Sequence, residues 1–102
     1  MAKLTDKISV PAYVDGDDLT VIRIPGGPAL CKMIRNGGSN LLRIHATAPA
    51  DATEQAKGWP LNPHASIAEQ GEAIVFDEDS GAHHTWFVTS DDGTDFYLII
   101  TA

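Results

Sequence analysis

The sequence has one cysteine, few basic residues and no apolar run of membrane length. The lone Cys31 excludes an internal disulfide and has no metal-ligand spacing. We expect it to be a small buried side chain, as free cysteines commonly are. No apolar run approaches the roughly 20 residues that a membrane-spanning helix needs, and residues 1–7 contain no apolar signal region. We therefore expect a protein that is neither inserted in a membrane nor secreted.

Basic residues are scarce and scattered. There are 7 Lys and Arg against 14 Asp and Glu, which gives a formal net charge of −7 at pH 7. Affinity for nucleic acid depends on Lys and Arg that neutralise phosphates. We therefore expect no nucleic-acid partner.

Helix signals are almost absent. The only segment with helix-forming content is 51–57, between Pro49 and Gly58. Asp51 is placed to cap it, with Glu54 three residues later as in a capping box. We expect one or two helical turns here.

The rest of the sequence consists of short β-branched, aromatic and aliphatic runs separated by turn residues. Strands are predicted at residues 7–10, 19–24, 29–35, 40–47, 65–68, 72–76, 85–90 and 95–101. This spacing predicts an all-β fold, a single antiparallel β-sandwich or small jelly roll of seven to eight strands. The weakly patterned residues 1–17 are expected to form an extended N-terminal arm or a first edge strand, and residues 18–102 the β-sandwich domain.

Two turns are predicted to close hairpins. Asn36-Gly37-Gly38-Ser39 would join the strands at 29–35 and 40–47, and residues 91–94 would join the last two. Asn and Gly tolerate the positive φ that hairpin turns require. The final run is apolar on both faces at residues 98–100, so we expect it to be central in its sheet or covered on both sides.

The residues that could carry chemistry form no recognisable motif. The four histidines are His45, His64, His83 and His84, and none forms the His-x-His pair that metal-binding cupins use. The acidic turns at 77–79 and 91–95 do not fit the twelve-residue calcium loop, and there is no Gly-x-Ser-x-Gly elbow. We expect no enzyme, no catalytic residue, no cofactor and no metal.

Aromatic residues give the remaining candidates for binding. Trp86 alternates with Val88 on a predicted strand, which favours a core position. Trp59 lies in a loop stiffened by prolines, where it would either plug one end of the fold or anchor a partner. The candidate partner-binding residues are Trp59, Pro60, Tyr13 and Val14.

A resemblance covers roughly residues 30 to 102. It is carried by the turn segment Ile34-Arg35-Asn36-Gly37-Gly38-Ser39-Asn40-Leu41-Leu42-Arg43-Ile44, the small-residue segment 46–50, the loop 58–63, Ser66-Ile67 and the ending Trp86-Phe87-Val88-Thr89-Ser90-Asp91-Asp92-Gly93-Thr94-Asp95. In this order of elements the chain resembles small tailed-phage virion proteins.

The resemblance implies a β-sandwich accessory protein of the virion, a group that includes capsid decoration (cement) proteins, head-fibre bases and tail or neck accessory modules. Of these we expect a capsid decoration protein, which stabilises the head by bridging capsid subunits. Its partners would be the major capsid protein or another virion protein. It would work as a homo-oligomer, with a trimer favoured, and would be made in the host cytoplasm. The group has no shared functional motif, so no functional residue is carried over.

Two alternatives remain open. A carbohydrate-binding or tail or head-fibre accessory module predicts Trp59, Trp86 or Tyr97 exposed together on one face, or a calcium ion held by Asp77 or Asp79. A small metal-dependent β-barrel enzyme predicts two or more histidines converging inside a cavity.

Overall fold

The computed structural model describes residues 3–12, 21–63 and 71–101. The described residues form eight strands and one short helix, which confirms the all-β prediction. These elements are β1 (Lys3–Val10), β2 (Ile22–Ile24), β3 (Cys31–Asn36), β4 (Leu42–His45), α1 (Ala52–Gln55), β5 (Trp59–Leu61), β6 (Ala73–Asp77), β7 (Trp86–Thr89) and β8 (Thr94–Thr101). The strand predicted at 65–68 lies outside the described residues. No helix among those described is long and apolar enough to cross a membrane.

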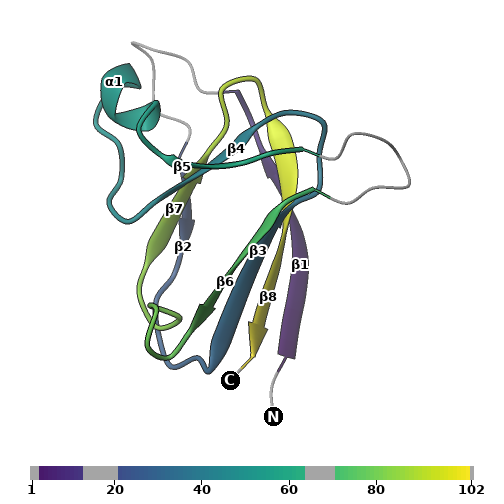
Figure 1. Ribbon diagram of the computed structural model, residues 1–102, viewed down its shortest axis with the longest axis vertical. Helices are drawn as coiled ribbons and strands as arrows, with labels where there is room; N and C mark the ends of the chain where they lie inside the picture. The colour runs from purple at the N-terminus through teal and green to yellow at the C-terminus, as the bar shows by residue number, and fades with distance from the viewer. Residues whose placement is uncertain (1–2, 13–20, 64–70, 102) are drawn as a thin grey trace.

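The strands form two four-stranded antiparallel sheets (Figure 1). The first sheet has the order β1-β8-β3-β6 and the second the order β2-β7-β4-β5. β8 lies between β1 and β3, so the central position predicted for the last strand is confirmed. β1 pairs along its whole length with β8, which places residues 3–10 as an edge strand of the first sheet.

Successive strands alternate between the sheets, and only β4 and β5 follow one another in the same sheet, with α1 in their connection. Both predicted hairpins are therefore wrong: the 36–39 turn leads from the first sheet to the second, and the 91–94 turn leads back. Among the described residues, positive φ occurs only at Gly27, Gly81 and Gly93. Gly37 and Gly38 thus do not supply the positive φ of a hairpin turn.

These two glycines are instead required by close packing. A Cβ at Gly37 would collide with the Tyr97 ring, and a Cβ at Gly38 with the Thr94 side chain. The turn can therefore lie directly against the start of β8 only because neither position carries a side chain.

Asn36 connects the two turns that cross between the sheets, at 36–39 and 91–94; these are called the crossover turns below. Its side chain is fully buried, and its Nδ2 donates hydrogen bonds to the carbonyls of Asn40 at 2.8 Å and Leu61 at 2.9 Å. Its Oδ1 accepts from the Gly38 amide at 3.1 Å and from Thr94 Oγ1 at 3.0 Å. One amide side chain therefore ties together β3, both crossover turns and β5.

The two sheets share one core. Buried apolar side chains come from both: Val10, Ile24, Ile34, Leu42, Ile44, Leu61, Phe76, Ala82, Val88, Phe96 and Leu98. Phe76 of β6 stacks on Trp86 of β7, with ring centroids 4.2 Å apart and an interplanar angle of 15°. Trp86 packs against this core, as its strand pattern predicted.

Lys32 is an unexpected buried residue, with 1% of its surface exposed. Its Nζ donates to the carbonyls of Pro25 at 3.2 Å and His84 at 3.1 Å. Burial lowers the pKa of Lys32 because it disfavours the charged ammonium. The ammonium thus joins the β2–β3 connection to the residues that precede β7.

Of three further local predictions, one is confirmed and two are wrong. Asp51 caps α1 by accepting from the Glu54 amide at 2.9 Å, as the sequence predicted. The segment of β5 was expected to be a loop stiffened by prolines, but it forms a strand, because proline is tolerated at a sheet edge. Cys31 is only half-buried rather than buried, because it lies at an alternate position to the core-facing Lys32 on β3.

Candidate functional site

A polar cluster lies on the outer face of the second sheet, beneath α1. Thr89 Oγ1 lies 2.8 Å from His45 Nε2 and accepts from Gln55 Nε2 at 3.1 Å. Gln55 Nε2 also donates to Asp91 Oδ1 at 2.7 Å, and Arg43 binds the same carboxylate through Nε at 3.0 Å and Nη2 at 3.2 Å. The cluster joins α1 to β4 and β7.

The electrostatics of this cluster favour a charged carboxylate and a neutral imidazole. The hydrogen bond from Arg43, supported by that from Gln55, lowers the pKa of Asp91. Burial, followed by the charge of Arg43, lowers the pKa of His45. Gly58 packs against the imidazole so closely that a Cβ there would lie 2.5 Å from His45 Cε1.

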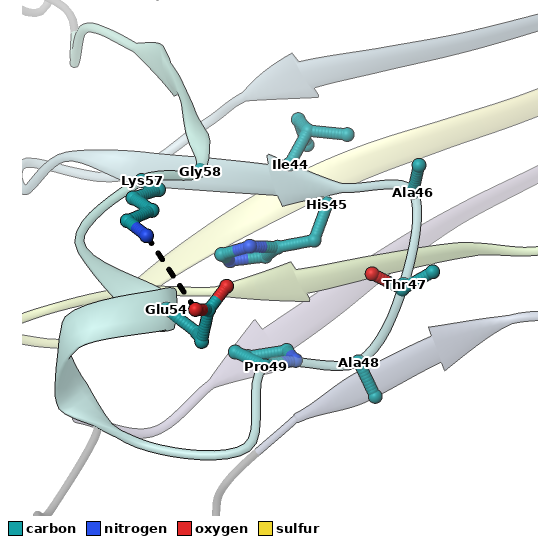
Figure 2. A pocket seen from close by; sticks show the side chains of 9 residues that line it. All are labelled: Ile44, His45, Ala46, Thr47, Ala48, Pro49, Glu54, Lys57 and Gly58. Atoms are coloured by element: carbon teal, nitrogen blue, oxygen red, sulfur yellow. Dashed lines mark hydrogen bonds and ion pairs between the residues drawn. The ribbon is translucent and has the colours of Figure 1, made fainter.

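A pocket of about 210 Å³ opens beside this cluster (Figure 2). Its lining includes His45, Pro49, Glu54, Lys57 and Gly58. Lys57 Nζ lies 3.5 Å from Glu54 Oε1, and both side chains are more than half exposed. These two charges pair with each other at the surface of the pocket, and the hydroxyl that is bonded to the imidazole, that of Thr89, is fully buried.

The predicted partner-binding residues are only partly described. Trp59 is 64% exposed and its neighbour Pro60 is exposed, both on the edge strand β5. Trp59 therefore does not plug the end of the fold and is available as a surface anchor. Tyr13 and Val14 lie outside the described residues.

The aromatic face expected of a carbohydrate-binding module is not formed by the three residues proposed for it. Trp86 lies against the core and donates its indole N–H to the Gly81 carbonyl at 2.9 Å. Tyr97 belongs to β8 of the first sheet, whereas Trp59 belongs to β5 of the second. They lie on different parts of the molecule.

The described histidines likewise do not converge. His45 is buried beneath α1, while His83 and His84 are exposed neighbours in the β6–β7 connection, with ring centroids 4.4 Å apart. His64 lies outside the described residues. Within the part of the chain that the structure describes, no group of three or more His, Cys, Asp or Glu could hold a metal ion.

The first acidic turn uses its leading carboxylate for its own structure. Asp77 Oδ1 accepts from the Asp79 amide at 3.0 Å, the Ser80 amide at 2.8 Å and Ser80 Oγ at 2.9 Å. These bonds, with the Ser80 hydroxyl foremost, lower the pKa of Asp77.

The outer face of the first sheet carries an apolar row that the sequence reasoning missed. Met33 of β3 is directly opposite Val75 of β6 and Ile99 of β8. Val75 is 56% exposed, and Met33 and Ile99 are half-buried. Tyr97, also exposed, lies two residues from Ile99 on the same face. The signal that could have found this outer apolar row (Val75, Met33 and Ile99) is the presence of apolar residues at successive positions of three strands.

Comparison with protein-family models found no match, and no curated protein is found to be similar to the chain.

Proposed function

We propose that this chain is a structural protein of a tailed-phage virion, a capsid decoration protein that binds its partners through the outer face of its first sheet. The single observation that carries the proposal is the outer apolar row. The row joins the exposed Val75 to the half-buried Met33 and Ile99, and apolar residues grouped on an outer surface favour a site of protein interaction. The net charge of −7 favours solubility of a chain that carries such a row on its surface.

The proposal extends to the type of all-β fold that the two sheets form. We infer that the two sheets form a small jelly roll, because the orders β1-β8-β3-β6 and β2-β7-β4-β5 come from strands that, β4 and β5 apart, alternate between the sheets. Jelly rolls serve in viral capsid proteins, lectins and cupins. The separation of Trp59, Trp86 and Tyr97 weighs against the carbohydrate-binding alternative, and that of the described histidines weighs against the small metal-dependent β-barrel enzyme.

The partner in this proposal is the major capsid protein or another virion protein, and the resemblance favours a trimer as the working form. Bridging of neighbouring subunits gains its free energy from the surface that it buries. Met33 is at the centre of the row, so it is the position at which a charge would interfere most.

The test is co-sedimentation of the purified chain with expanded phage heads that lack it. We expect wild-type chain to bind, and Met33→Glu to weaken binding about tenfold or more, because a carboxylate would be buried without a partner. Thr53→Glu adds the same charge at an exposed position of α1 and should bind as wild type. Heads that bind none of the three, or a chain that instead binds glycans on an array, would contradict the proposal.

A further inference from the structure

The four edge strands of the two sheets differ in how they are protected. Proteins commonly keep edge strands from pairing with other chains by making them short or by placing proline or lysine on them. β2 and β5 have three residues each, β5 contains Pro60, and β1 contains Lys7. β6, Ala73-Ile74-Val75-Phe76-Asp77, has none of these features.

The backbone of β6 is in a defined phase. The Asn36 amide donates to the Glu72 carbonyl at 2.9 Å. Residues of an antiparallel strand direct their amide and carbonyl alternately to one side and the other. Ile74 and Phe76 therefore face β3, and Ala73, Val75 and Asp77 face the open edge.

The hydrogen bonds of Asp77 agree with this alternation, because its amide and carbonyl both point away from β3. Its amide donates to Ser80 Oγ at 2.8 Å and its carbonyl accepts from the Ala82 amide at 2.8 Å, both in the following turn. Ala73 and Val75 direct their two amides and two carbonyls outward, and within the described residues no hydrogen bond to these four groups is found. These two amides and two carbonyls have the spacing at which a docking strand would form main-chain hydrogen bonds.

The surroundings of this edge select the strand that would bind. The Val75 side chain begins the outer apolar row, which offers apolar contact to a strand laid beside β6. Glu72 precedes β6, and Asp77, Glu78 and Asp79 end it, all exposed. A second copy of β6 paired antiparallel would bring these acidic ends together, so the charges favour a different, basic partner.

We infer that the open edge of β6 accepts an extended strand from a partner protein, with β-branched residues at its centre and Lys or Arg at its ends. Such strand addition gains affinity from main-chain hydrogen bonds and specificity from alternate side chains. The inference rests on the proposed function in that it names the kind of segment that the virion partner would supply.

The test uses two synthetic peptides, Lys-Thr-Val-Thr-Val-Thr-Lys and Glu-Thr-Val-Thr-Val-Thr-Glu, with the full chain followed by NMR amide exchange. We expect saturating basic peptide to slow exchange at Ala73 and Val75 at least tenfold, and the acidic peptide to bind at least tenfold more weakly. Equal affinity for the two peptides, or protection at another edge in place of β6, would overturn the inference.

Variants separate the backbone from the charges. Val75→Pro removes an outward amide without removing a bond to β3, and should abolish binding. Ser9→Pro is its matched control on β1: Ser9 is opposite Asp95, whose carbonyl bonds Gly37 on the other side, so the Ser9 amide also faces outward. Glu78→Lys, at an exposed position, keeps every edge amide and should reduce the preference for the basic peptide.

Three further outcomes are decisive. Protection of Ala73 and Val75 that rises with protein concentration alone, with a dimer in sedimentation, would make a second copy the occupant and overturn the inference. Heads that bind the chain while the peptides leave both amides unprotected would overturn it as well and leave the proposed function standing. Peptide protection without binding to heads would support the strand site and contradict the proposed function.

Discussion

Replacing Asn36 with alanine is a quantitative test of how the two sheets are joined. The Asn36 side chain is fully buried and makes four hydrogen bonds, to the carbonyls of Asn40 and Leu61, the Gly38 amide and the Thr94 hydroxyl. Each such bond contributes about 1 kcal/mol net, and partners left buried and unpaired cost more. We expect Asn36→Ala to lower the free energy of unfolding by about 4 kcal/mol.

This loss is large for a domain of 102 residues. Such domains are stable by about 5–15 kcal/mol in total. A loss of that size corresponds to a fall in Tm of about 15–30 °C. It should be measured by urea unfolding, followed through tryptophan fluorescence, with an unchanged m-value as the sign that the variant still unfolds from a native state.

The matched control is Asn40→Ala. It removes only the hydrogen bond from Asn40 Nδ2 to the Gly93 carbonyl, 2.7 Å long, and keeps the Asn40 carbonyl that Asn36 binds. We expect a loss of about 1 kcal/mol. If Asn36→Ala costs no more than Asn40→Ala, Asn36 does not hold the crossovers together and the reasoning is refuted.

Three further substitutions test the buried charged and packed groups. Because burial lowers the pKa of Lys32, the unfolded chain binds more protons, so stability should rise as pH increases toward 10.5; Lys32→Met should remove that rise in urea unfolding at pH 7 to 10. The pKa of His45 is also lowered, so the stability that neutral His45 provides above about pH 6.5 should be lost as pH falls toward 5; His45→Gln should flatten this loss. Gly58→Ala should displace the imidazole, lower the free energy of unfolding by about 1–3 kcal/mol and move the NMR-measured pKa of His45 back toward 6.5.

Each of these has a contradicting result. Parallel pH profiles for wild type and Lys32→Met would show that the ammonium is not buried in the folded state. An unchanged acid limb in His45→Gln would assign the loss of stability to carboxylates instead. A Gly58→Ala variant as stable as wild type would mean that the imidazole can shift without cost.

The sequence predicted the local structure of segments better than it predicted which strands pair with one another. The alternation of Trp86 and Val88, the capping of the helix by Asp51 and the central place of residues 98–100 follow from periodicity and side-chain chemistry, which act within a few residues. The Asn36–Ser39 turn was expected to pair the strands that it joins, but a turn signal does not indicate which sheet the next strand enters. The sheet that the next strand enters depends on how strands distant in the sequence pair with it and bury its core-facing side chains.

The candidate surfaces show the same division. Trp59 and Pro60 were singled out from their local context, and the structure places both on the surface. The outer apolar row became visible only when the register placed Met33 between Val75 and Ile99. The Gln55–Thr89 bond joins residues 34 positions apart, and no spacing in the sequence announces such a pair.

The position of β8 has a consequence for how the chain acquires its structure. β1 ends at Val10, yet its partner β8, Thr94–Thr101, comes last among the described strands. During synthesis β1 therefore stays unpaired until nearly all of the described residues have been made. The edge of β3 that pairs with β8 stays unpaired for equally long. Truncation at residue 93 would therefore remove the middle of a sheet rather than fray its edge. We expect folding to be slow and to set in only when this final strand is inserted between two others.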